Sequence, residues 1–174
     1  MEFGARCDSA IRSHLTSPRN RCHVFPLHEI PPYNADCDGD RSPTSVRALR
    51  VAVHEADGLV LCSPEYNYGM SGVLKNAIDW ISRPALQSVL KNKPTLLVSC
   101  SPAYTGGARA HAQMRETLSA CLARVVARPQ VVINHAAEKI IGGRLADSAT
   151  LAFIDEALGD LTAEILGLRR LAAS

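Results

Sequence analysis

A loop at residues 63–69 carries side chains that suit a planar ligand. It reads Ser-Pro-Glu-Tyr-Asn-Tyr-Gly. Tyr66 and Tyr68 offer flat apolar faces with a polar tip, and Asn67 can both donate and accept hydrogen bonds. Such a loop fits a heteroatom-rich ring better than a metal ion or a long polymer. The alternative is a tyrosine-containing turn that packs on its own helix, and the residues alone leave both open.

A second loop, residues 101–110, reads Ser-Pro-Ala-Tyr-Thr-Gly-Gly-Ala-Arg-Ala. Gly106 and Gly107 let the backbone approach a ligand closely, and Ser101 adds a hydroxyl group. A Gly-Gly pair is also typical of an ordinary helix start, which remains the alternative. Arg109 either pairs within the protein or meets a dinucleotide phosphate, and the sequence favours the structural role.

Both loops follow an expected strand and precede an expected helix. The short apolar run at residues 59–62 predicts a strand buried on both faces. Helical spacing of apolar residues follows at 73–81. The same alternation returns with a buried strand at 93–100 and a helix at about 108–126. In open α/β sheets, ligands bind beyond the carboxyl ends of the strands, which is where both loops are expected.

Residues 63–80, Ser-Pro-Glu-Tyr-Asn-Tyr-Gly-Met-Ser-Gly-Val-Leu-Lys-Asn-Ala-Ile-Asp-Trp, resemble the signature of the NADPH-dependent FMN reductase family. This flavodoxin-like group includes FMN, quinone, azo-dye and chromate reductases. In that family the Pro-Glu-Tyr-Asn turn holds the isoalloxazine ring of FMN. The resemblance therefore implies cofactor contacts at Pro64, Glu65, Tyr66 and Asn67. The family usually has a smaller residue where Tyr68 stands, so this ring is expected to alter access to the flavin.

The second loop resembles the family's Ser-x-Gly-x-x-Gly-Gly-x-Arg-Ala loop, which touches the ring and ribityl side of the flavin. This likeness implies further cofactor contacts at Ser101, Gly106 and Gly107. Ala103 replaces the commoner glycine of the family pattern.

The resemblance covers about residues 24–170 and implies one flavodoxin-like domain over residues 1–174. Its fold is a three-layer α/β sandwich with a parallel sheet, in the strand order 2-1-3-4-5. Family members begin with a buried strand and a phosphate-binding loop at a helix N-terminus. Here residues 6–8, Arg-Cys-Asp, fall opposite that loop's Ser-x-Asn, and only five residues precede them. Residues 1–22 are therefore expected to be atypical or truncated, with the first strand missing or replaced and FMN binding weakened.

Patterns elsewhere predict further elements. A strand near a sheet edge is expected at 23–27 because of Pro26, and Asp147 is a candidate helix cap. The remaining expected elements are helices at 9–16, 42–56 and 151–168 and a final strand at 128–134.

Composition narrows the class of protein. The 174 residues are 47% hydrophobic and 21% charged, with a net charge of +2, which is ordinary globular usage. No clustered basic face indicates nucleic acid, and no apolar run reaches the roughly 20 residues of a membrane span. No leader pattern is present, so a cytoplasmic location is expected. The sequence pI of about 8.3 disfavours a strongly acidic one-electron carrier of the flavodoxin type.

The six cysteines include no Cys-x-x-Cys pair, which argues against zinc and thioredoxin-like sites. Cys62 and Cys100 are predicted to be small buried hydrophobes, and all six thiols are expected to be free. Asp36, Asp38 and Asp40 alternate as in a calcium loop, but no glutamate follows at the twelfth position. No metal site is expected.

The sequence contains no nucleophile elbow, His-Glu-x-x-His or P-loop. No catalytic side chain is expected, because a flavin cofactor carries the redox chemistry, and Glu65 is interpreted as structural. The resemblance implies an oxidoreductase that passes electrons from NADPH through FMN to a small acceptor: a flavin, quinone, azo compound or metal oxyanion. It also implies a homodimer or homotetramer with residues 73–80 near the interface. The alternative is a non-catalytic flavodoxin-like remnant or dimerisation module with impaired FMN binding.

Overall fold

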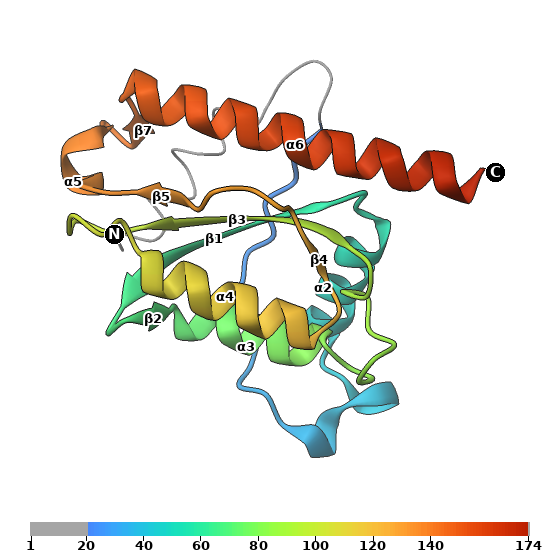
Figure 1. Ribbon diagram of the computed structural model, residues 1–174. Coiled ribbons are helices and arrows are strands. Elements are labelled where there is room, and N and C mark those ends of the chain that lie inside the picture. Colours follow the sequence, from blue (N-terminus) through green and yellow to red (C-terminus); the bar gives the residue numbers. More distant parts are fainter. Residues whose placement is uncertain (1–20, 174) are drawn as a thin grey trace.

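A mostly parallel sheet lies between two layers of helices in the computed structural model, which describes residues 21–173 (Figure 1). The strand order is β2-β1-β3-β4, and β5 also pairs with β3. The strands are β1 (Leu59–Tyr66), β2 (Gly69–Met70), β3 (Pro94–Cys100), β4 (Arg124–Val125) and β5 (Val131–Ile133). Within this five-stranded sheet only β2 runs antiparallel to its neighbour, so the carboxyl ends of β1, β3 and β5 meet at one edge.

The main helices are α2 (Thr44–Glu55), α3 (Gly72–Ile81), α4 (Ala108–Ala120) and α6 (Ser148–Ala172). Short elements fill the connections: the 3₁₀ turns η1 (Ala35–Cys37) and η2 (Gly39–Arg41), α5 (Ala136–Lys139), and a hairpin of β6 (Ile140–Ile141) and β7 (Arg144–Leu145). Within the described residues, no helix is both long enough and apolar enough to cross a membrane.

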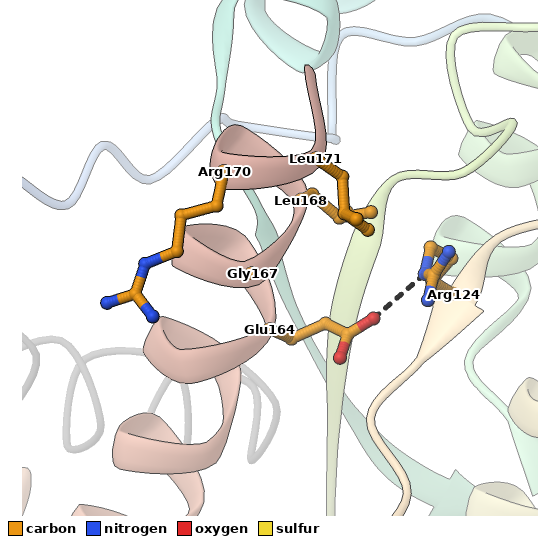
Figure 2. Close-up of a pocket in the computed structure, with 6 residues that line it drawn as sticks. All are labelled: Arg124, Glu164, Gly167, Leu168, Arg170 and Leu171. Carbon is orange, nitrogen blue, oxygen red and sulfur yellow. Dashed lines mark hydrogen bonds and ion pairs between the residues drawn. The ribbon is translucent and has the colours of Figure 1, made fainter. Parts of the chain in front are cut away.

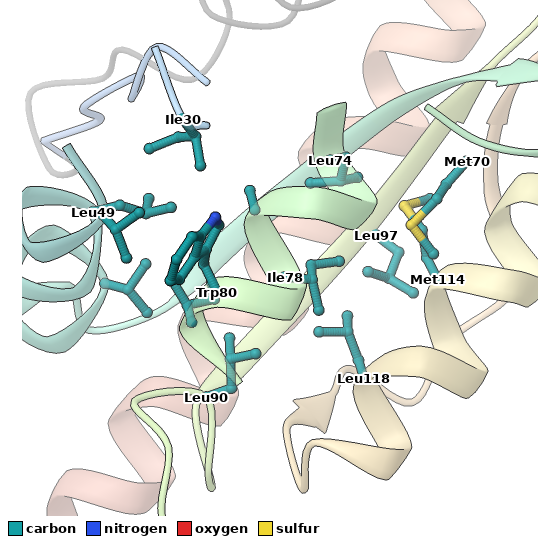
Figure 3. Packing of buried hydrophobic residues seen from close by; sticks show 14 of the residues in the cluster. Ile30, Leu49, Met70, Leu74, Ile78, Trp80, Leu90, Leu97, Met114 and Leu118 are labelled. Carbon is teal, nitrogen blue, oxygen red and sulfur yellow. The ribbon is translucent and has the colours of Figure 1, made fainter. Parts of the chain in front are cut away.

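The core forms on both sides of β3, because successive side chains of a strand point to opposite faces. Leu97 belongs to a cluster that includes residues of α2, α3 and α4 (Figure 3). Leu96 and Val98 pack instead against α6 on the other face. All seven residues of β3 are buried, which confirms the strand predicted at 93–100.

Several predicted elements are confirmed. Helices lie at α2, α3 and α6 where helical spacing predicted them. Asp147 caps α6, since its carboxylate accepts the N–H of Thr150 at 2.9 Å. The indole of Trp80 donates to the carbonyl of Pro31 at 2.8 Å, and the Asn76 side chain bonds the same carbonyl at 2.9 Å. The signature helix thereby fixes the segment that precedes η1.

Four predictions about element limits are wrong. Residues 23–27 form no strand, because they pair with no strand in the described part of the chain. β1 runs on to Tyr66, so most of the predicted loop at 63–69 is strand. The helix predicted at 108–126 stops at Ala120, since Leu122 has a φ of 60° and residues 124–125 join the sheet. The strand predicted at 128–134 covers only Val131–Ile133.

The strand at 59–62 is less buried than predicted. Its four residues are half-buried rather than fully buried on both faces. Along the edge opposite β3, Glu65 and Tyr66 pair with β2, and no other described strand pairs there. The predicted helix at 9–16, residues 6–8 and most of 1–22 lie outside the described residues.

The cysteine prediction is also corrected. Cys100 is fully buried as predicted, but it is disulfide-bonded, so the expectation of six free thiols is wrong. Cys62 is half-buried rather than buried. Burial excludes neither a thiol nor a disulfide, which is why the sequence pattern misjudged Cys100.

Candidate functional site

The first predicted loop is a tight hairpin. Tyr66 pairs with Gly69 across the β1–β2 ladder, so only Asn67 and Tyr68 form the turn. Their φ angles are 49° and 67°, and two-residue hairpin turns of this kind require positive φ at both central positions. Asparagine tolerates this region, whereas tyrosine rarely adopts it. Tyr68 lies at the tip of this turn, and 72% of the residue is exposed.

The hairpin is tied to the start of α3. The Ser63 hydroxyl accepts the N–H of Ser71 at 2.9 Å and donates to the carbonyl of Pro64 at 2.9 Å. The Ser71 side chain accepts the N–H of Leu74 and caps α3. Ser63, though fully buried, is thus satisfied by its neighbours, and it ties β1 to the start of α3.

Glu65 joins the hairpin to the second loop. Its Oε2 accepts the backbone N–H groups of Arg109 and Ala110, each at 3.0 Å. α4 begins after Gly107, which has no side chain to cap it, so Glu65 supplies the cap from 44 residues away. A carboxylate at a helix N-terminus is stabilised by the exposed amides and by the helix dipole. This contact supports the structural interpretation of Glu65.

The second loop is pressed against the sheet. Gly106 and Gly107 have φ angles of 62° and 89°. A Cβ on Gly106 would lie 2.9 Å from the Asn134 backbone nitrogen, and one on Gly107 would lie 3.0 Å from the Ser99 Cβ. Glycine is therefore required at both positions by conformation and by space. The loop presents backbone to the edge of the sheet.

Ser101 has a mainly internal role. Only 7% of the residue is exposed. Its N–H donates to the Ile133 carbonyl at 3.1 Å, and its hydroxyl accepts the N–H of Ala103 at 3.2 Å. A flavin contact at Ser101 remains a prediction, with only a small part of the residue available.

The structure brings all eight predicted cofactor contacts to one edge of the sheet. Pro64 lies opposite Cys100 in the β1–β3 register, which sets Ser101 beside the hairpin. The tyrosines of this edge are exposed, at 47% for Tyr66, 72% for Tyr68 and 80% for Tyr104. Tyr104 meets His135 edge to face, with ring centroids 6.0 Å apart.

Two further side chains lie at this edge: Arg109, for which the sequence favoured a structural role over a phosphate contact, and Gln113, which the sequence prediction missed. The Cζ of Arg109 lies 3.8 Å from the centroid of the Tyr68 ring. Gln113 accepts the N–H of Met70 at 2.7 Å through Oε1. Arg109 and Gln113 are four residues apart on α4, so they share one face of the helix. That spacing is the signal that would have marked them as neighbours.

The donor set fits the ring of FMN. In the described part of the chain, the backbone N–H groups of Asn67, Tyr68, Tyr104 and Thr105 have no acceptor. Free amides suit the several acceptor atoms of an isoalloxazine ring, and exposed tyrosine faces suit its planar surface. The Oε2 atom of Glu65 is already engaged with the amides at the start of α4.

Inside α4, His111 is almost fully buried at 2% exposure. Burial, followed by the nearby positive charge of Arg115, holds the pKa of His111 below its ordinary value. Its Nδ1 has no hydrogen-bond partner among the described residues. The side chain is therefore neutral at pH 7, and protonation would place an unpaired charge in the core.

The hollow drawn in Figure 2 lies elsewhere. It is lined by the C-terminal half of α6 and by Arg124, which pairs with Pro94 at the amino end of β3. Its polar groups include the ion pair of Arg124 with Glu164 at 2.8 Å. None of the predicted cofactor contacts lines it, and it is at the opposite end of the sheet from them.

Comparisons with known proteins agree with this geometry. Residues 11–138 match the family model described as NADPH-dependent FMN reductase. The chain is 35% identical over 156 residues to the NAD(P)H-dependent FMN reductase PA1204 of Pseudomonas aeruginosa, covering 89% of this chain and 84% of the relative. It is 38% identical over 140 residues to a quinone reductase of Escherichia coli K12, covering 79% and 72%.

A solved structure supports the fold. The flavoenzyme NAD(P)H:(acceptor) oxidoreductase FerB from Paracoccus denitrificans superposes with a TM-score of 0.78 at 28% identity. The match covers 94% of this chain and 88% of FerB. The flavodoxin-like fold predicted from the sequence is therefore confirmed.

Proposed function

The chain belongs to the NADPH-dependent FMN reductase family, and from this premise we propose that the edge formed by the two loops is its flavin site. The chain is an oxidoreductase that uses FMN and NAD(P)H. FMN supplies the hydride and electron transfer when it is bound, while the protein binds and orients the reactants. No catalytic side chain is proposed.

The proposed cofactor contacts are those predicted from the sequence: Pro64, Glu65, Tyr66, Asn67, Tyr68, Ser101, Gly106 and Gly107. Asn67 and Tyr68 would donate backbone N–H groups to the ring, and Gly106 and Gly107 would bring the second loop close to it. Glu65 would act indirectly, through α4. The observation that carries the proposal is the contact of the Glu65 carboxylate with the amides of Arg109 and Ala110, because it fixes the two loops at one site.

The acceptor is a small molecule, and we propose a quinone among the candidates of the family. A quinone is planar, and it would stack on the flavin face beside Tyr68 and Tyr104, whose rings are largely exposed. A relative at 38% identity is named a quinone reductase, which supports this choice. Reduction takes two electrons and two protons per quinone and yields the hydroquinone.

We further propose a homodimer or homotetramer that works in the cytoplasm. The contact would involve α3, where Val73 is 52% exposed. Light scattering coupled to gel filtration measures the mass, and a monomer at micromolar concentration would contradict the dimer and the tetramer alike.

The test of the proposed function begins with the visible spectrum and an FMN titration of the apo-protein by flavin-fluorescence quenching. We expect bound flavin whose absorbance near ~450 nm bleaches on adding NADPH and returns on adding a quinone. A protein that quenches no FMN fluorescence up to high micromolar concentration would favour a non-catalytic fold. Tyr66→Ala and Asn67→Ala variants then test the proposed contacts, with Val51→Ala as a distant control on an exposed face of α2.

A further inference from the structure

We infer that Arg109 is a specificity-determining residue that binds the 2′-phosphate of NADPH and thereby favours NADPH over NADH. This inference rests on the proposed function and names a residue outside the predicted cofactor contacts. It reverses the expectation from the sequence, which favoured a structural pairing for Arg109. The reversal follows from how Arg109 is held and from what its side chain does not contact.

Arg109 is held at both ends. Its backbone N–H donates to Oε2 of Glu65 at 3.0 Å, which fixes the first turn of α4 against β1. Its guanidinium lies over the Tyr68 ring, with the Cζ 3.8 Å from the ring centroid. Tyr68 reaches this position because its φ of 67° turns it out of the hairpin. An arginine stacked on an aromatic ring is pre-organised and loses less conformational entropy on binding.

The guanidinium has no anionic partner in the part of the chain that the structure describes. Within residues 21–173, Arg109 forms no ion pair and no side-chain hydrogen bond, although it is exposed at the rim of the proposed site. Four arginines away from the site are paired: Arg50 with Asp38, Arg124 with Glu164, Arg128 with Asp160 and Arg169 with Asp57. Glu65, the carboxylate that reaches the start of α4, is engaged by backbone amides. The charge of Arg109 is thus left for a ligand.

Phosphate is the anion whose geometry suits this group. A guanidinium presents its N–H donors at the edge of its plane, so a ring against its face leaves them free for two parallel bonds to phosphate oxygens. In the reaction of this family, the pyridine nucleotide comes to the bound flavin from outside and always bears phosphate, and a free FMN acceptor would bear phosphate too. NADPH and NADH differ only by the 2′-phosphate, so a contact there changes one affinity and spares the other. An anionic acceptor shares this chemistry, and the experiment separates the two.

The experiment measures the two half-reactions of the FMN-loaded enzyme separately by stopped-flow absorbance. For Arg109→Gln we expect the Kd for NADPH in the reductive half-reaction to rise at least about ten-fold, since a charge-assisted contact is lost. The Kd for NADH and the limiting rate of flavin reduction should change by less than about three-fold. Arg109→Lys should restore part of the NADPH affinity, because the charge returns without the planar fork.

Two variants control the interpretation. Arg170→Gln removes the same charge from the exposed last turn of α6, remote from both loops, and should leave both nucleotide affinities unchanged. Tyr68→Phe keeps the ring under Arg109 and should preserve the NADPH preference, whereas Tyr68→Leu should reduce it.

The outcomes are distinct. Equal weakening of NADPH and NADH by Arg109→Gln, or no change in either, would overturn the assignment. A loss confined to the oxidative half-reaction with a sulfonated quinone, and absent with a neutral quinone, would also overturn it and assign the charge to the acceptor. Failure of the proposed function itself looks different, because the wild-type protein would then show no flavin reduction by either nucleotide.

Discussion

The two loops of the proposed flavin site have different residue types at their left-handed backbone positions. Both leave the carboxyl end of a parallel strand and turn through positive φ angles. In the hairpin the left-handed positions carry Asn67 and Tyr68, whose side chains project from the turn. In the second loop they carry Gly106 and Gly107, where a Cβ would collide with β5 and β3.

The hairpin exposes side chains, whereas the second loop brings its backbone close to the strands. A hairpin at the open end of the sheet has room around it, so its turn can present side chains and accept some backbone strain. A loop that returns across the ends of β3 and β5 has no such room, so only glycine lets its backbone lie close to the strands. Changing the size of the side chains at these positions tests this difference between the two loops.

The largest effect is expected for Gly106→Ala. The new Cβ would lie 2.9 Å from the Asn134 nitrogen in a left-handed conformation. Strain and overpacking together should lower the free energy of unfolding by about 2–5 kcal/mol. Urea denaturation measures the loss, and FMN affinity should fall with it. Gly142→Ala is the control, since its φ of 58° carries similar strain but nothing lies within 4 Å. Equal losses in both variants would contradict the role given to close approach.

A smaller loss is expected for Glu65→Ala, which removes the contact between the two loops. The amides of Arg109 and Ala110 would lose their acceptor, which should cost about 1–3 kcal/mol of unfolding free energy. Glu65→Gln keeps one carbonyl oxygen and should lose less. Thermal and urea unfolding measure stability, and flavin quenching measures FMN binding. Glu116→Ala on the exposed side of the same helix is the control, and a similar loss there would argue against a specific cap.

A dependence of stability on pH is expected from His111 in α4, the helix that Glu65 caps. Burial lowers the pKa of His111 below the ordinary value of about 6.5. As pH falls through that ordinary value, His111 binds a proton in the unfolded chain but not in the folded protein. Stability is therefore full above the unfolded pKa and falls with acidification, by at most about 1.4 kcal/mol per pH unit for one group. The loss ends only once pH passes below the folded pKa.

Urea unfolding between pH 7.5 and 5.5 tests this dependence on His111. His111→Gln should flatten the slope, because the replacement does not titrate. His28→Gln provides the comparison, since that side chain is 78% exposed. A wild-type slope that survives in His111→Gln would assign the pH dependence to other groups.

The smallest effect is expected for Asn67→Gly. Glycine removes the strain of the φ of 49° but adds freedom to the unfolded chain, so the two contributions oppose each other. The free energy of unfolding should change by less than about 1 kcal/mol, far less than for Gly106→Ala. A loss as large as that of Gly106→Ala would mean that the Asn67 side chain, rather than the backbone, holds the hairpin.

The sequence by itself determined the helices α2, α3 and α6, the buried strand β3 and the Asp147 cap. Each of these depends on a period or a capping residue within one element, so local spacing suffices to predict it. The segment at 63–80 also carried enough of the family pattern to predict the flavodoxin-like fold and an FMN-dependent oxidoreductase. The ends of β1 and α4 could not be predicted as well from the sequence. They are set by pairing partners and φ angles, which leave no periodic pattern.

Only the tertiary structure decided what the polar side chains of the site do. Glu65 reaches amides 44 residues along the chain, and Arg109 lies on Tyr68 rather than against a carboxylate. Residues 23–27 have an apolar pattern but pair with no strand among the described residues. Periodicity reports the average burial of an element, whereas a hydrogen bond or a stacked cation depends on distances of a few ångströms between elements. Those distances are set by how the layers pack.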